Sequence, residues 1–190
     1  MGFLDALLGR RKVKGPAPDR LFAITTAAVA LEAGPGIRTR GAAAIVFQPL
    51  ATGDFRQIAQ EMEEVVRGTG EETGTTLETS DDTYGYRWMV LRDDDIEDLA
   101  VGINAVSDAL AVGGYGERVL CAVFAFEDAG HRPIYFIYNY KRGSWYPFVP
   151  APGDQQRSNE RELQVQAQVG AELPIEPELE RWFPLWGAPI

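Results

Sequence analysis

A repeated pattern of two extended apolar stretches followed by a helical stretch constrains the fold of this chain more than any other feature. In the first unit, extended stretches at 26–33 and 41–49 flank a Gly34-Pro35-Gly36 turn, and a helix follows over 54–67. The apolar residues of that helix recur every three or four positions, which is the period of a helix that buries one face.

Two further units follow the same pattern. The second has extended stretches at 75–79 and 84–92 and a helix from about 94 to the Gly113-Gly114 pair, and the third has stretches at 119–126, 133–140 and 145–149 and a helix over 158–171. Three hairpin-plus-helix units predict a mainly antiparallel sheet with the helices packed on one face, an α+β fold.

The chain divides into a short leader and one domain. Its 190 residues suit a single domain with a substantial core. Residues 1–19 form an amphipathic segment followed by a basic linker rich in proline and glycine, and residues 20–190 form the predicted α+β domain. We expect the aromatic run from Trp182 to Trp186 to cross the sheet as an extended strap, because Pro184 and Pro189 prevent a long helix.

The distribution of charge excludes one class of function. The net charge is −10, and the acidic residues concentrate between residues 71 and 98. Nucleic-acid binding requires a clustered basic face, so we expect no nucleic-acid partner. The only basic run lies in the leader, at residues 10–14.

Composition also favours a cytoplasmic location. Cys121 is the single cysteine, so the chain cannot form an internal disulfide, and a reducing compartment is expected. The sequence has neither a secretory signal pattern nor an apolar run of the roughly 20 residues that a membrane-spanning helix needs.

We find no constellation of residues with the spacing of a catalytic, cofactor or metal site. The acidic run from Asp93 to Asp98 is explained by helix capping, since it lacks the alternating spacing of a calcium loop. His131 is predicted to lie in a strand–strand turn, about 20 Å from Cys121 at about 3.3 Å per strand residue, so the two cannot pair. The sequence therefore predicts a protein that is not an enzyme.

The leader is the strongest candidate for a contact site. Four apolar residues share one face of a short helix and four cations follow them: Phe3, Leu4, Leu7 and Leu8, then Arg10, Arg11, Lys12 and Lys14. Burial of the four apolar side chains would contribute about 6–12 kcal/mol, and ordering eight residues costs about 8–16 kcal/mol. The segment therefore needs a covering surface, which could be a protein partner, an anionic membrane, its own domain or a second copy.

A concentration of aromatic residues supports an alternative function. A pocket for a small ligand, or for the substrate of an unrecognised enzyme, would be lined by aromatic side chains with polar groups: Trp88, Tyr138, Tyr140, Trp145 and Tyr146. The competing interpretation is that these rings simply fill the core of a hairpin.

Four pieces of the sequence resemble the PspA-associated protein family, which is linked to bacterial phage-shock systems of envelope stress. The pieces are Met1–Gly9, Tyr84-Gly85-Tyr86 with Trp88, Tyr140–Gly143 with Tyr146–Phe148, and Arg181–Pro189. The resemblance covers most of the chain, and its most specific piece is the last.

This resemblance implies association with PspA-like envelope-stress machinery, and it transfers no catalytic residue. We therefore expect a non-enzymatic accessory or scaffold protein that docks to a PspA-like partner through its leader, with the inner face of the membrane as a further docking surface. A homodimer formed through the two apolar ends remains an alternative.

Overall fold

The structure, a computed structural model, describes residues 18–190. Its centre is one six-stranded sheet with the order β2-β3-β1-β4-β5-β6, in which every neighbouring pair is antiparallel. The strands are β1 (Arg38–Phe47), β2 (Thr76–Asp81), β3 (Arg87–Arg92), β4 (Val119–Glu127), β5 (Pro133–Asn139) and β6 (Ser144–Phe148). The α+β prediction is confirmed, and the sheet is open.

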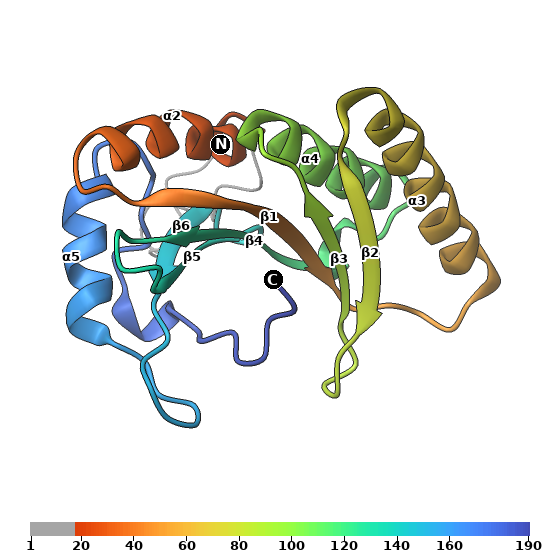
Figure 1. Cartoon of the computed structure of the whole chain (residues 1–190). Helices are drawn as coiled ribbons and strands as arrows, with labels where there is room; N and C mark the ends of the chain where they lie inside the picture. The colour runs from red at the N-terminus through yellow and green to blue at the C-terminus, as the bar shows by residue number, and fades with distance from the viewer. Residues whose placement is uncertain (1–17) are drawn as a thin grey trace, which may run out of the picture.

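Within residues 18–190, four α-helices accompany the sheet: α2 (Pro18–Ala33), α3 (Gly53–Thr73), α4 (Ile96–Val112) and α5 (Asn159–Val169). Two short 3₁₀ helices, Gly116–Arg118 and Leu179–Arg181, complete the described elements. Figure 1 shows α2, α4 and α3 on one side of the sheet and the C-terminal segment on the other, with α5 beside the β6 end.

The prediction of an extended stretch at 26–33 is wrong, because these residues belong to helix α2. Leu21, Ile24, Ala27 and Leu31 are all buried against the sheet, and their spacing is that of a helix face. The first unit is therefore helix–strand–helix, and β1 takes the central place between β3 and β4.

Helix α3 extends six residues beyond its predicted end at 67. Its terminal turn passes so close to the following chain that a Cβ on Gly70 would lie 2.2 Å from the Thr75 carbonyl oxygen, so glycine is required there. The helix then stops at Gly74, whose φ of 94° is a left-handed conformation that glycine adopts without strain.

Alternation along the strands divides the interior into two apolar layers. One face of the sheet packs against all four helices, with Ile45, Phe124 and Phe136 at its centre. The opposite face carries Val46, Val123 and Ile137, and it packs against the C-terminal residues, including Trp182, Trp186 and Ile190. Helices thus cover only one face, and the C-terminal segment covers the other.

Candidate functional site

The five aromatic residues predicted to line one pocket do not come together. Tyr138, Tyr140 and Trp145 lie in the layer between the sheet and the helices, whereas Trp88 and Tyr146 lie in the layer beneath the C-terminal segment. The sheet itself separates the two groups. The prediction of a common pocket is therefore wrong.

On the helix side, the rings are packed against one another. The Tyr138 ring lies 5.0 Å from that of Tyr140 and 5.1 Å from that of Trp145, measured between centroids. The indole Nε1 of Trp145 donates to the Arg20 carbonyl oxygen at 2.7 Å and so joins β6 to the first turn of α2. These three residues are part of the hydrophobic core.

On the other side, the rings hold the C-terminal segment against the sheet. Tyr146 stacks on Trp182 with 6.3 Å between centroids, and its hydroxyl donates to the Phe183 carbonyl oxygen at 3.1 Å. Burial raises the pKa of Tyr146 well above its ordinary value, so the hydroxyl stays protonated and remains a donor. Phe148 and Trp186 meet edge to face at 5.0 Å.

Two buried carboxylates fix the same segment by ion pairs. Glu162 of α5 accepts hydrogen bonds from Nε and Nη2 of Arg157, and Arg157 Nη1 donates to the Trp182 carbonyl oxygen at 2.6 Å. Glu176 is paired with Arg142 in the β5–β6 turn. Burial alone would raise the pKa of Glu176, but hydrogen bonds from Arg142, the Glu178 N–H and Ser144 outweigh it and lower the pKa.

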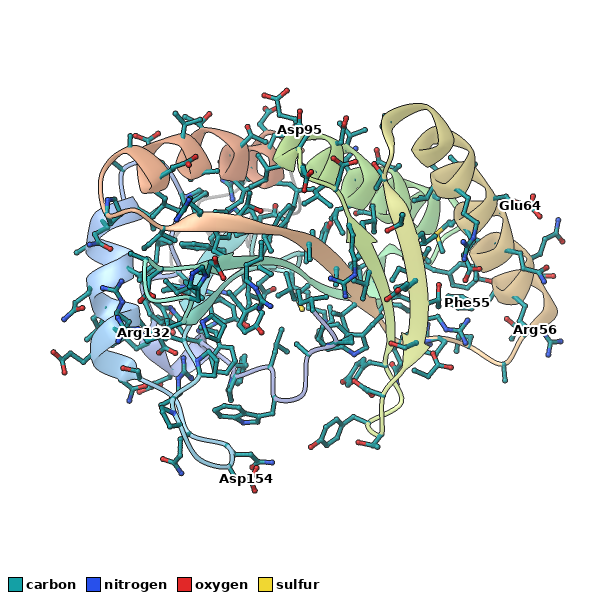
Figure 2. All side chains as sticks on the ribbon, in the orientation of Figure 1. Phe55, Arg56, Glu64, Asp95, Arg132 and Asp154 are labelled. Atoms are coloured by element: carbon teal, nitrogen blue, oxygen red, sulfur yellow. The ribbon has the colours of Figure 1, made fainter. Side chains whose placement is uncertain are left out.

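Trp88 borders a hollow of about 560 Å³ between the β2–β3 hairpin and the C-terminal segment. Its remaining lining comprises Ser80, Asp81, Asp82, Thr83, Tyr84, Asp154, Gln155, Trp186, Gly187 and Pro189. Among the residues that the structure describes, three carboxylates and three aromatic rings line the hollow, and no lysine or arginine does. Figure 2 shows Asp154 at the tip of the loop that borders this side of the molecule. Such a surface suits a cationic group.

Asp82, which lines this hollow, also stabilises the β2–β3 turn through hydrogen bonds. Its Oδ2 accepts a hydrogen bond from the Trp88 indole at 2.9 Å, and its Oδ1 accepts from the Tyr84 and Tyr86 amides. Desolvation raises the pKa of Asp82, but these hydrogen bonds outweigh it, so the pKa is lowered and the carboxylate stays ionised. Asp81 is ionised for a similar reason, because a hydrogen bond from Arg87 lowers its pKa.

A second hollow lies on the outer helical surface, between α3 and α4. We call it the α3–α4 groove; it measures about 270 Å³ and is lined by Ile58, Glu61, Met62, Val65, Val66, Ala105, Val106, Ala109, Val112 and Gly113. Past Val66 and Ala105 it continues into a smaller hollow that reaches Val101 and Asp98. Val112 is 90% exposed and Val101 is 48% exposed, so part of its apolar lining faces solvent. This groove was not predicted from the sequence.

The leader residues predicted to make contacts lie outside the described residues. These are Phe3, Leu4, Leu7, Leu8, Arg10, Arg11, Lys12 and Lys14. Within residues 18–190 there is no cluster of three or more histidine, cysteine, aspartate or glutamate side chains placed to hold a metal ion. In the same part of the chain, no helix has the length and apolar character needed to cross a membrane.

Comparison with protein-family models shows the family to which the chain belongs. The model described as PspAB, PspA associated protein B, matches residues 1–190, the entire sequence. The chain belongs to the PspA associated protein B family. The match confirms the resemblance drawn from the terminal and aromatic motifs, and it includes the leader as well as the domain. Neither the curated proteins nor the solved structures contain a match to this chain.

Proposed function

We propose that this member of the PspA associated protein B family is a non-enzymatic accessory protein of a PspA-type envelope-stress system. It acts in the cytoplasm by docking to a PspA-like protein, and its leader makes the contact. The observation that carries the proposal is the family match over residues 1–190, since it includes the apolar face and the cations of the leader.

The architecture of the domain supports a docking role. Aromatic rings and two buried ion pairs fasten the C-terminal segment to the sheet, and these contacts consolidate the domain that follows the leader in the sequence. A rigid body with a short apolar segment matches the way amphipathic helices dock into grooves of partners.

The leader also suits an anionic membrane surface at the inner face. Its four cations could contribute about 4 kcal/mol near anionic lipid, at about 1 kcal/mol each. The acidic domain, with a net charge of −10 for the whole chain, would be repelled by the same surface, so contact would be made through the leader alone.

A binding experiment tests both contacts. The full-length protein and a variant lacking residues 1–14 are titrated with a purified PspA-type protein, and each is floated with vesicles of anionic or of zwitterionic lipid. We expect partner binding to be lost with the deletion, and flotation to need both the leader and anionic lipid. Equal partner binding by the two proteins would refute leader docking, and equal flotation would remove the membrane contact.

The hollow beside Trp88 favours a second candidate function, the binding of a cationic ligand. Three aspartates line this hollow together with Tyr84, Trp88 and Trp186, and aromatic faces attract cations. Titration with an arginine-rich peptide, monitored by tryptophan fluorescence, tests this candidate with Asp154→Asn as the variant. Asp154 is exposed, and its carboxylate makes no hydrogen bond or ion pair within residues 18–190, so the variant leaves the fold intact. Tryptophan fluorescence that does not change when the peptide is added would refute this function.

A further inference from the structure

The α3–α4 groove is an apolar surface that no described segment of the chain covers. Its floor is formed by Met62 and Val66 of α3 and by Ala105 and Ala109 of α4, and Val112 stands 90% exposed at its end. We propose that this groove binds the chain's own leader, with the apolar face of residues 3–8 lying between α3 and α4. The proposal concerns the free protein and is independent of any partner or membrane.

The chemistry of the leader matches that of the groove. Phe3, Leu4, Leu7 and Leu8 would place a helical apolar stripe about two turns long against a floor of methionine, valine and alanine. Small residues such as alanine on one wall let a second helix approach closely. The groove extends along α4 from Asp98 to Val112, about 21 Å at 1.5 Å per residue, so a two-turn helix fits within it.

Charge favours the same occupant. The carboxylates of Glu61 and Asp98 lie along the groove and its continuation, and within residues 18–190 no lysine, arginine or histidine lines either hollow. On α3, the exposed Glu64 also projects from the helix, as Figure 2 shows. The cations at 10–14 follow directly after the apolar face, so docking brings them to an acidic rim.

The tether is long enough for the leader to reach the groove. Helix α2 begins at Pro18, and nearby the Arg20 guanidinium donates to the Gly143 carbonyl oxygen at 3.0 Å. Lys141 in the same turn lines a hollow together with Ser107 on α4. The start of α2 is therefore separated from the groove by the width of one helix, α4, which is about 10–12 Å. The nine residues from 9 to 17 can span up to about 30 Å at 3.3 Å per residue.

Photocrosslinking of the full-length chain tests the proposal. A benzophenone amino acid replaces Phe3, and the crosslinked residues are mapped by mass spectrometry at several protein concentrations. We expect crosslinks within one molecule to α3 and α4, with Met62 prominent, at a yield that does not depend on concentration. Crosslinks that grow with concentration would overturn the proposal in favour of a second copy, and crosslinks elsewhere or none would overturn it outright.

A matched pair of variants isolates the groove. Val101→Lys/Val112→Lys places two cations at exposed groove positions, where they repel the basic end of the leader and reduce the apolar contact. We expect the crosslink yield to fall about tenfold, which corresponds to 1.4 kcal/mol of docking free energy. The control Val29→Lys alters a 71% exposed valine of α2 outside the groove, and its yield should equal that of the wild type. An equal yield in the groove variant and the control would also overturn the proposal.

Discussion

The ion pair between Arg157 and Glu162 joins three parts of the fold, and its removal gives a sharp test of how the C-terminal segment is held. Glu162 is 2% exposed and accepts hydrogen bonds from Arg157 and from the Val149 amide at 2.9 Å. Arg157 in turn binds the Trp182 carbonyl oxygen and lies over the Phe148 ring, 5.5 Å from its centroid. The variant Glu162→Gln keeps the shape of the side chain and removes its charge.

The structure sets the size of the expected effect. Removing one partner of a buried ion pair costs about 3–5 kcal/mol, because the remaining charge is left in a medium of low polarity. Arg157 retains 22% side-chain exposure, and glutamine still offers an oxygen to the Val149 amide. We therefore expect the lower end, a loss of about 3 kcal/mol in the free energy of unfolding.

Urea denaturation measures this loss. With a slope of about 2 kcal/mol per molar urea, the midpoint should fall by about 1.5 M without a change in slope. The control Arg181→Gln removes the exposed pair with Glu178, and it should cost less than about 1 kcal/mol. If Glu162→Gln costs no more than the control, the buried pair does not hold the segment in the way described.

Three further perturbations have defined outcomes. The pKa values of Asp82, Asp128 and Glu176 are lowered in the folded protein. The stability that these carboxylates provide is therefore fully present above their unfolded pKa values near 4, and it is lost as the pH falls through their folded pKa values. Urea midpoints between pH 7 and pH 3 should therefore decline below about pH 4.5, and a constant midpoint would contradict this. Burial raises the pKa of the Cys121 thiol to about 12, so a thiol reagent at pH 8 should modify the protein only after unfolding. Trp145→Phe removes the hydrogen bond to Arg20 and leaves a void, which should lower the free energy of unfolding by about 2–3 kcal/mol and speed amide hydrogen exchange in α2. Unaltered exchange would show that Trp145 does not stabilise α2.

The sequence predicts the strands well because their alternation and turns are local signals. The stretch at 119–126 appears as β4 (Val119–Glu127), and that at 133–140 appears as β5 (Pro133–Asn139). The exception is 26–33, where Thr26 and Val29 favour a strand locally and a Gly-Pro-Gly turn follows. Packing of Ile24 and Leu31 against the sheet overrides that preference, and the helical spacing of Leu21, Ile24, Ala27 and Leu31 is the sequence signal that the strand prediction missed.

The error over the aromatic pocket has a different origin. Adjacent residues of a strand point to opposite faces, so Trp145 and Tyr146 could not share a pocket, and the period of two predicts this without a structure. The α3–α4 groove, in contrast, depends on which helices become neighbours. On α4, Leu110 is fully buried in the core, whereas Val112 is 90% exposed and lines the groove.

The most direct test of the account is the affinity of the full-length chain for a purified PspA-type protein, compared with that of Leu4→Ser/Leu7→Ser. Each leucine contributes about 1.5–3 kcal/mol when buried, so the double variant should bind at least about 100-fold more weakly. The control Val29→Ser, at an exposed apolar position of α2, should bind like the wild type. An unchanged affinity for Leu4→Ser/Leu7→Ser would contradict the claim that the leader makes the contact.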